Sequence, residues 1–208
     1  MTGKFITFEG GEGAGKSTQA QLLAERLRAC GIEVVLTREP GGTPGAEAIR
    51  DLIVTGDTDR WDAATEALLV NAARADHVVQ LIRPALARGA WIVCDRFIDS
   101  TLAYQGAGKG VAHDALLTLH SFSTNDLWPD ATILLELPIA LGASRAEARG
   151  RLDRFEATGG GFHARVAAGF AAVADAEARV HRVDASPAPE IVATAVWEHI
   201  APLTDQAA

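Results

Sequence analysis

The segment from residue 10 to residue 17 (GGEGAGKS) combines closely spaced glycines with a lysine and a hydroxyl group. Glycine lets the backbone turn so that successive N–H groups point inward and form a cradle for phosphate oxygens. Lys16 would reach the β- and γ-phosphates of a nucleotide, and the Ser17 hydroxyl would bind Mg²⁺. The pattern is that of a P-loop at every fixed position. We expect ATP to be bound by Gly10, Gly11, Glu12, Gly13, Ala14, Gly15, Lys16, Ser17 and Thr18.

Glu12 is unusual inside such a loop. A carboxylate among phosphate-binding groups repels the nucleotide unless its side chain faces another ligand. We therefore favour a Glu12 side chain that faces a second ligand. The alternative is a solvated side chain on the loop surface.

Asp95 and Arg96 follow an apolar run, residues 91–95 (WIVCD), that is typical of a buried strand. A P-loop protein places its Mg²⁺-directed carboxylate at such a strand tip, beside the first strand. An arginine next to it could grip a phosphate with two hydrogen bonds. We therefore predict a Mg²⁺ site at Ser17 and Asp95 and a phosphate site at Arg96. An Asp–Arg pair that only caps the strand is the alternative.

Two further arginines stand near the same predicted edge of the fold. Arg38 follows the second predicted strand, and Arg74 lies mid-helix on an otherwise apolar, alanine-rich face. A buried arginine needs a partner for its charge. An internal carboxylate or a ligand could serve Arg74, and we favour the ligand.

Arginines also cluster between residues 145 and 154, ahead of a glycine-rich patch at residues 158–161 (TGGG) that predicts a mobile loop. One interpretation is a solvated basic face that pairs with Glu147 and Asp153. The other is a lid, residues 142–162, that closes over ATP. An arginine delivered to a phosphoryl-transfer transition state raises the rate by about 10³ to 10⁵. Because the P-loop offers only Lys16, we favour the lid as the source of the additional cation.

The surrounding pattern predicts the elements that would position these residues. Apolar runs alternate with stretches of helical periodicity, which indicates a parallel sheet covered on both faces. The predicted strands are 4–9, 33–37, 91–95, 131–137 and 180–184, and the predicted helices are 17–30, 46–54, 63–87, 112–122, 139–149, 163–179 and 189–200. The fold class is therefore α/β, a P-loop NTPase fold with a five-stranded parallel sheet flanked by helices, in a single domain over residues 1–208. Ligands bind such sheets beyond the carboxyl ends of the strands.

The composition restricts the partners. A net charge of −8 argues against broad electrostatic binding of nucleic acid or of an anionic membrane. No apolar run approaches the roughly 20 residues of a membrane span, and no basic-then-apolar signal pattern opens the chain. A cytoplasmic protein is expected.

Four segments in this order resemble bacterial thymidylate kinase, a P-loop nucleoside-monophosphate kinase: FITFEGGEGAGKST, TREPGGTPGAEAIR, CDRFIDSTLAYQGAGKG and RGRLDRFE. The resemblance covers residues 4 to about 186. It implies ATP- and Mg²⁺-dependent phosphorylation of dTMP to dTDP for dTTP synthesis, in a homodimer.

The resemblance also implies roles for single residues. It assigns dTMP binding to Glu12, Arg38, Arg74, Arg96, Ser100, Tyr104 and Gln105, with Arg74 reading a thymine carbonyl and Arg96 holding the phosphate. Gly13 stands where one class of the family has an arginine, so the lid arginines would act instead. Catalysis is thus expected from Lys16, Arg96, Arg149, Arg151 and Arg154. Val70 stands where the family usually has a phenylalanine that stacks on thymine.

Two other functions stay open at this point. A kinase for another nucleoside monophosphate or for a deoxynucleoside is compatible with Val70, although the DRxxxSxxAYQ pattern argues against it. A non-catalytic nucleotide-binding protein is the second alternative. Intact Lys16, Ser17 and Asp95 argue against this second alternative.

Overall fold

The computed structural model describes residues 3–148, 150 and 159–205. At its centre lie five strands, all parallel, in the order β2-β3-β1-β4-β5. The strands are β1 (Phe5–Gly10), β2 (Val34–Arg38), β3 (Trp91–Asp95), β4 (Ala131–Glu136) and β5 (Val180–Asp184). The predicted five-stranded parallel sheet is confirmed, with strand bounds within one or two residues of those expected.

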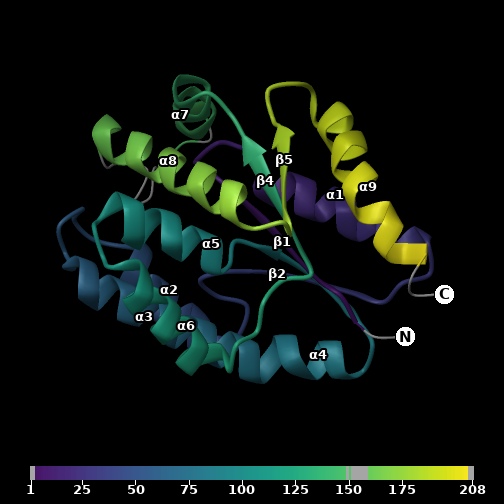
Figure 1. Ribbon diagram of the computed structural model, residues 1–208, viewed down its shortest axis with the longest axis horizontal. Coiled ribbons are helices and arrows are strands. Elements are labelled where there is room, and N and C mark those ends of the chain that lie inside the picture. The colour runs from purple at the N-terminus through teal and green to yellow at the C-terminus, as the bar shows by residue number, and fades with distance from the viewer. Residues whose placement is uncertain (1–2, 149, 151–158, 206–208) are drawn as a thin grey trace.

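Helices cover both faces of this sheet. They are α1 (Lys16–Ala29), α2 (Pro44–Val54), α3 (Ala63–His77), the π-helical turn η1 (Val78–Ile82), α4 (Arg83–Ala87), α5 (Ile98–Thr101), the π-helical turn η2 (Leu102–Gly108), α6 (His113–Thr124), α7 (Ile139–Ala148), α8 (Gly160–Ala176) and α9 (Pro189–Asp205). Figure 1 shows α1 and α9 on one side of the sheet and α3, α5, α6 and α8 on the other. None of the helices in the described part of the chain is long and apolar enough to cross a bilayer.

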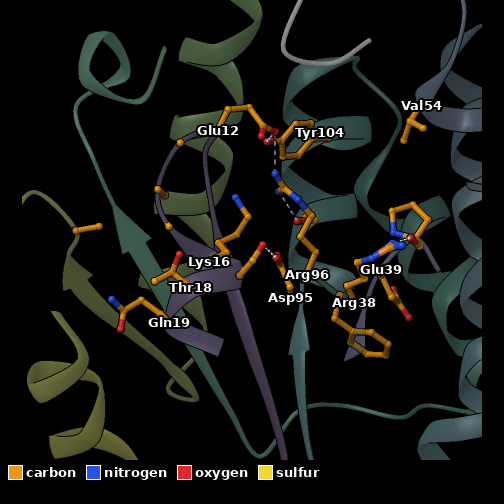
Figure 2. Close-up of a pocket in the computed structure, with 18 of the residues that line it drawn as sticks. Glu12, Lys16, Thr18, Gln19, Arg38, Glu39, Val54, Asp95, Arg96 and Tyr104 are labelled. Atoms are coloured by element: carbon orange, nitrogen blue, oxygen red, sulfur yellow. Dashed lines mark hydrogen bonds and ion pairs between the residues drawn. The ribbon is translucent and has the colours of Figure 1, made fainter. Parts of the chain in front are cut away.

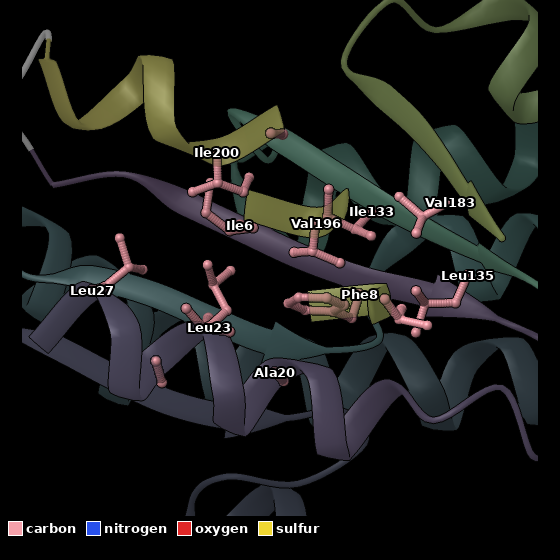
Figure 3. Close-up of a cluster of buried hydrophobic side chains, with 14 of the residues drawn as sticks. Ile6, Phe8, Ala20, Leu23, Leu27, Ile133, Leu135, Val183, Val196 and Ile200 are labelled. Atoms are coloured by element: carbon pink, nitrogen blue, oxygen red, sulfur yellow. The ribbon is translucent and has the colours of Figure 1, made fainter. Parts of the chain in front are cut away.

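Side-chain alternation along the strands divides the core into two layers. Ile6 and Phe8 of β1 face α1 and α9, where they join Leu23 and Val196 in one buried cluster (Figure 3). Phe5 belongs to a second cluster on the other face of the sheet. The three central strands β1, β3 and β4 are buried on both faces, so their sequences are nearly continuous apolar runs.

The stretch predicted as one helix over residues 63–87 is divided into α3, η1 and α4. Pro84 lies in the first turn of α4. Proline lacks an N–H group and its ring clashes with the carbonyl four residues earlier, so it disturbs a regular α-helix. The π-helical turn directly before α4 is a local widening of the kind that accommodates such a break. The helical path continues, but with a change of pitch.

The structure differs from the sequence prediction in two other places. The mobile loop predicted over 158–161 is wrong for Gly160 and Gly161, which form the first turn of α8. Phe162, Val166 and Phe170 pack in one cluster with Tyr104, and this packing stabilises α8 despite its glycines. The helical segment formed by α5 and η2 was not predicted at all.

The carboxyl ends of β1, β2 and β3 meet at one edge of the sheet. The register pairs Phe8 of β1 with Asp95 of β3, and Asp95 with Arg38 of β2. The P-loop, the loop after β2 and the start of α5 therefore emerge side by side. This arrangement brings the chemical groups singled out in the sequence to one place.

Candidate functional site

A cavity of about 630 Å³ opens at this edge of the sheet. The P-loop lines one wall, and the opposite wall comes from the loop after β2 and from α2, α3, α5 and η2. Figure 2 shows the order: Lys16, Thr18 and Gln19 lie on one side of Arg96, and Arg38 and Glu39 lie on the other. We call these the P-loop wall and the side-chain wall.

The P-loop connects β1 to α1 through backbone geometry that requires glycine. Gly13 and Gly15 have φ values of +70° and +86°. Lys16 is buried, and its Nζ donates to the carbonyls of Gly10 at 3.2 Å and Gly11 at 2.8 Å. Burial and the nearby Arg96 lower the pKa of Lys16. The ammonium group is thus held within its own loop, where phosphate oxygens can replace the carbonyls.

Ser17 and Asp95 meet as the sequence predicted. The Ser17 hydroxyl donates to Asp95 Oδ2 at 2.5 Å. Among the described residues, no group of three or more His, Cys, Asp or Glu side chains could hold a metal by itself. Mg²⁺ typically takes only one or two protein oxygens and completes its octahedron with phosphates and water, so this pair fits Mg²⁺.

Arg96 occupies the centre of the cavity. Its φ of +72° is in the left-handed region, which a residue with a side chain enters at a cost of about 1–3 kcal/mol. Its Nη2 donates to Glu12 Oε1 at 2.7 Å, and its Nη1 donates to Gly10 O at 3.2 Å and Ser100 Oγ at 3.1 Å. Burial alone would lower the pKa of Arg96, but Tyr104, Glu12 and Asp95 raise it above its ordinary value. The guanidinium therefore stays charged.

Glu12 faces the side-chain wall. Besides Arg96, its Oε1 accepts a hydrogen bond from the Tyr104 hydroxyl at 2.6 Å (Figure 2). The carboxylate thus points at other binding groups, as expected for a side chain that would otherwise repel the nucleotide. Burial raises the pKa of Tyr104, so the phenol remains a hydrogen-bond donor.

Arg74 has an internal carboxylate as one of its partners. Its side chain is 1% exposed, and its Nε donates to Glu39 Oε2 at 2.8 Å. The internal carboxylate, ranked second from the sequence, is therefore its partner. Nη2 donates to Thr101 Oγ1 at 2.9 Å, whereas Nη1 has no hydrogen-bond partner among the described residues. Since Arg74 also lines the cavity, one N–H group is left for a ligand.

The other predicted acceptor residues also line the cavity. Arg38 is 46% exposed and pairs with Glu47 at 3.1 Å. Gln105 Nε2 donates to the fully buried Glu66 at 2.9 Å. The same cavity lining includes Glu12, Arg38, Arg74, Arg96, Ser100, Tyr104 and Gln105, together with residues 13–18 of the P-loop. Gly10 and Gly11 line a smaller cavity of about 190 Å³ behind the loop instead.

Comparison with known proteins identifies the family. The model of the thymidylate kinase family matches residues 8–196. The chain belongs to the thymidylate kinase family. A thymidylate kinase of Rhizorhabdus wittichii is 50% identical over 206 residues, 98% of this chain and 99% of that relative. One from Pseudomonas fluorescens Pf0-1 is 56% identical over 186 residues, 89% of each chain. The crystal structure of thymidylate kinase from Ehrlichia chaffeensis has a TM-score of 0.76 at 34% identity and covers 95% of this chain and 98% of its own.

The lid expected for this thymidylate kinase is described only at its two ends. Arg149, Arg151 and Arg154 lie outside the described residues. Arg145 on α7 donates to Ala185 O at 2.9 Å and to Ser186 O at 3.1 Å. Arg145 therefore ties α7 to the loop after β5.

The P-loop and α7 touch at two glycines. A Cβ at Gly13 would come within 2.1 Å of the Gly142 carbonyl oxygen. A Cβ at Gly142 would come within 2.4 Å of the Glu12 carbonyl oxygen. This contact leaves no room for a side chain at position 13.

Several lining residues of this thymidylate kinase site were missed from the sequence. Glu39 and Thr101 are neighbours of predicted residues, so their motifs carried a usable signal. Gln19 of α1 donates to Pro189 O at 2.9 Å, across 170 positions. Nothing local in the sequence indicates that contact, because it depends on how α1 and α9 pack.

Proposed function

We propose that the cavity holds ATP along the P-loop wall and dTMP along the side-chain wall, with the transferred phosphoryl group between Lys16 and Arg96. As a member of the thymidylate kinase family, the chain phosphorylates dTMP to dTDP with ATP as the donor. One observation carries the arrangement. Lys16 Nζ and Arg96 Nη1 both donate to the Gly10 carbonyl, each at 3.2 Å. Two cations from opposite walls thus converge on one point.

This convergence suits in-line phosphoryl transfer. An oxygen of the dTMP phosphate attacks the γ-phosphorus of ATP, and the bond from that phosphorus to the β,γ-bridging oxygen breaks. Two anions must approach each other for this step, so positioning and charge neutralisation dominate its catalysis. Arg96 neutralises the acceptor phosphate, and Lys16 stabilises the charge that develops on the donor.

Mg²⁺ would be held by the Ser17 hydroxyl and the Asp95 carboxylate, the oxygen pair that lies 2.5 Å apart beside the P-loop. When bound, it neutralises the β- and γ-phosphate oxygens and orients them. Asp95 also lies one residue before Arg96. The end of β3 would therefore position both the metal of the donor and the phosphate of the acceptor.

The acceptor groups have distinct parts in this proposal. Arg74 offers Nη1 to a thymine carbonyl, and Glu12 faces the deoxyribose. Arg38, Ser100, Tyr104 and Gln105 complete the pocket. Val70, which is buried and lines the cavity, takes the place of a stacking aromatic ring.

The donor side is completed by the lid. We assign ATP binding to residues 10–18 and the additional cation to Arg149, Arg151 or Arg154. Residues 142–162 would move as a lid on a single kinase domain, residues 1–208. Arg145 would anchor its base to the loop after β5.

We also propose a homodimer in the cytoplasm, without nucleic acid or membrane partners. Leu68 and Val79 are 55% and 60% exposed, and with Ala72 and Ala75 they follow helical spacing along α3 and η1. Phe122 of the adjacent α6 is 92% exposed. Large exposed apolar side chains of this kind favour a protein partner, and a second copy of the chain is the proposed one.

A coupled assay of ADP release tests the acceptor assignment. We expect selective turnover of dTMP over UMP, CMP and thymidine. Preference for UMP or for the nucleoside would instead identify the other kinase. If calorimetry with Mg²⁺ detects neither ATP nor dTMP binding to folded protein, the cavity assignment is wrong.

A further inference from the structure

The loop after β2 wraps around one buried histidine. His77, in the last turn of α3, is 0% exposed. Its Nε2 lies 2.8 Å from Thr37 Oγ1, and its Nδ1 lies 3.0 Å from Glu39 Oε1. Gly42 presses on the same ring, since a Cβ there would come within 2.6 Å of Nε2. One imidazole therefore contacts Thr37 in β2 and two positions of the loop that follows it.

The residue between the two contacts points the other way. Arg38 ends β2 and pairs with Glu47, whereas Thr37 and Glu39 both bind His77, and Arg38 and Glu39 both line the cavity. Successive side chains of an extended backbone alternate in this way. Holding both neighbours of Arg38 thus also determines where Arg38 enters the cavity.

Glu39 transmits this contact to Arg74. Its Oε1 is bound to His77 and its Oε2 to Arg74 Nε at 2.8 Å. Burial alone would raise the pKa of Glu39, but Arg74 and His77 bring it below its ordinary value, so the carboxylate is ionised. With one partner on each oxygen, the carboxylate cannot rotate without breaking a buried hydrogen bond.

Arg74 is consequently held on three sides. Glu39 binds Nε, Thr101 accepts from Nη2, and the guanidinium carbon lies 4.9 Å from the centre of the Phe97 ring. Nη1 is buried and has no hydrogen-bond partner among the described residues. A buried donor left unpaired is unfavourable, because the hydration that it lost is not replaced. An acceptor oxygen of a ligand in the cavity would remove that cost.

We infer that His77 is a positioning residue for the acceptor nucleotide, which orients Glu39 so that Arg74 presents Nη1 to a carbonyl oxygen of the pyrimidine base. The inference rests on the proposed assignment of Arg74 to the acceptor site. His77 itself touches no substrate. It acts on the base end of the acceptor and leaves the ATP phosphates unaffected, because its hydrogen bonds in the described part of the chain go to Thr37 and Glu39 and not to the P-loop.

The test compares four variants of the full chain with the parent protein: His77→Leu, His77→Asn, Arg74→Ala and Asn71→Ala. Asn71 is the matched control, since it is buried on the same helix, bonds to Ala67 O at 2.8 Å and Ser123 at 3.2 Å, and does not line the cavity. The readouts are the dTMP Kd by calorimetry, the KM values for dTMP and ATP, kcat and Tm.

We expect His77→Leu to raise the dTMP Kd and KM about tenfold or more, because misplacing a binding group by about 1 Å can cost up to about 10²-fold. The ATP KM should change less than about twofold. His77→Asn keeps an amide donor for Glu39 and should recover part of the loss. Asn71→Ala should lower Tm and leave the ratio of the two KM values unchanged.

The outcomes separate the inference from the site assignment. If His77→Leu keeps the parent's dTMP affinity while Arg74→Ala loses it, the inference is overturned and the acceptor site stands. If Arg74→Ala also keeps it, the acceptor site itself is wrong. If His77→Leu does not fold, the KM values of Thr37→Val and His77→Asn for dTMP and ATP test the inference instead. A rise in the dTMP KM alone supports the inference, and an equal rise in both KM values, or none, overturns it.

Discussion

The P-loop wall of the cavity comes from one continuous segment of the chain, whereas the side-chain wall comes from several separate elements. The P-loop wall is one uninterrupted segment, residues 12–19, and it contributes a single lysine to the cavity. The side-chain wall gathers side chains from the loop after β2 and from α2, α3, α5 and η2, and ion pairs such as Arg74–Glu39 hold some of them in place. The first wall depends on local backbone geometry, and the second depends on the packing of distant elements.

This difference predicts two kinds of mutational effect. On the P-loop wall a lost charge should reduce the rate with little change in stability. On the side-chain wall the same groups bind the ligand and neutralise buried carboxylates. Removing one partner of a buried ion pair costs about 3–5 kcal/mol, so binding and folding should be lost together there.

Lys16→Ala should have the largest effect on activity. It removes the cation that serves the donor phosphates, and loss of one transition-state donor costs about 10²–10³-fold in kcat. Steady-state kinetics and a thermal melt would measure the loss of rate without a large loss of Tm. Lys4→Ala is the matched control, because Lys4 pairs with Asp130 at 3.1 Å away from the cavity. Activity within a few-fold of the parent would contradict the role of Lys16.

Arg96→Ala tests the point where the two walls meet. We expect kcat/KM for dTMP to fall about 10²-fold or more, since a phosphate ligand and the neutralisation of Glu12 are lost together. A lower Tm should accompany that loss, because the Glu12 carboxylate loses its 2.7 Å partner. Combining the variant with Glu12→Gln should recover part of the stability but not the activity. Full activity in either variant would refute a phosphate site at Arg96.

Val70→Phe should strengthen dTMP binding at the side-chain wall, because it adds an aromatic ring beside the proposed base site. Stacking of an aromatic ring on a base contributes about 1–3 kcal/mol, so the dTMP Kd should fall about fivefold or more. Calorimetry with dTMP measures this directly, and Val54→Phe, on the neighbouring helix of the same cavity, controls for bulk alone. An unchanged dTMP Kd would show that base recognition uses other contacts.

Glu9→Gln should have the smallest effect, and we expect it in the pH dependence of stability. Burial, with the nearby Asp99, raises the pKa of Glu9 from 4.5 to about 8. Between these values the folded chain keeps a proton that the unfolded chain releases, so this group's contribution is full below 4.5 and is lost as the pH rises through 8. The urea midpoint of the parent should therefore fall from pH 6 to pH 9 more steeply than that of Glu9→Gln. Parallel slopes for the two proteins would contradict the assignment.

The sequence predicted the P-loop wall better than it predicted the side-chain wall. The P-loop and the meeting of Ser17 with Asp95 were predicted, because strand ends in a parallel sheet converge whatever covers the sheet. The pairing of Arg74 with Glu39 stood only as the second alternative in the sequence, and the tertiary structure shows it. Glu39 is 35 positions away, and its burial depends on the turn after β2 and on His77. The helical segment of α5 and η2 was missed, although the acceptor motif lies on it.

By itself, the amino-acid sequence determined the parallel sheet, the phosphate cradle and the family. Each of these depends on residue types at short spacing, where glycine geometry and apolar runs act almost independently of the rest of the chain. Only the tertiary structure decided which carboxylate neutralises which arginine: Glu12 for Arg96 and Glu39 for Arg74. Such pairs are selected by distance and by burial, and both are properties of the packed molecule.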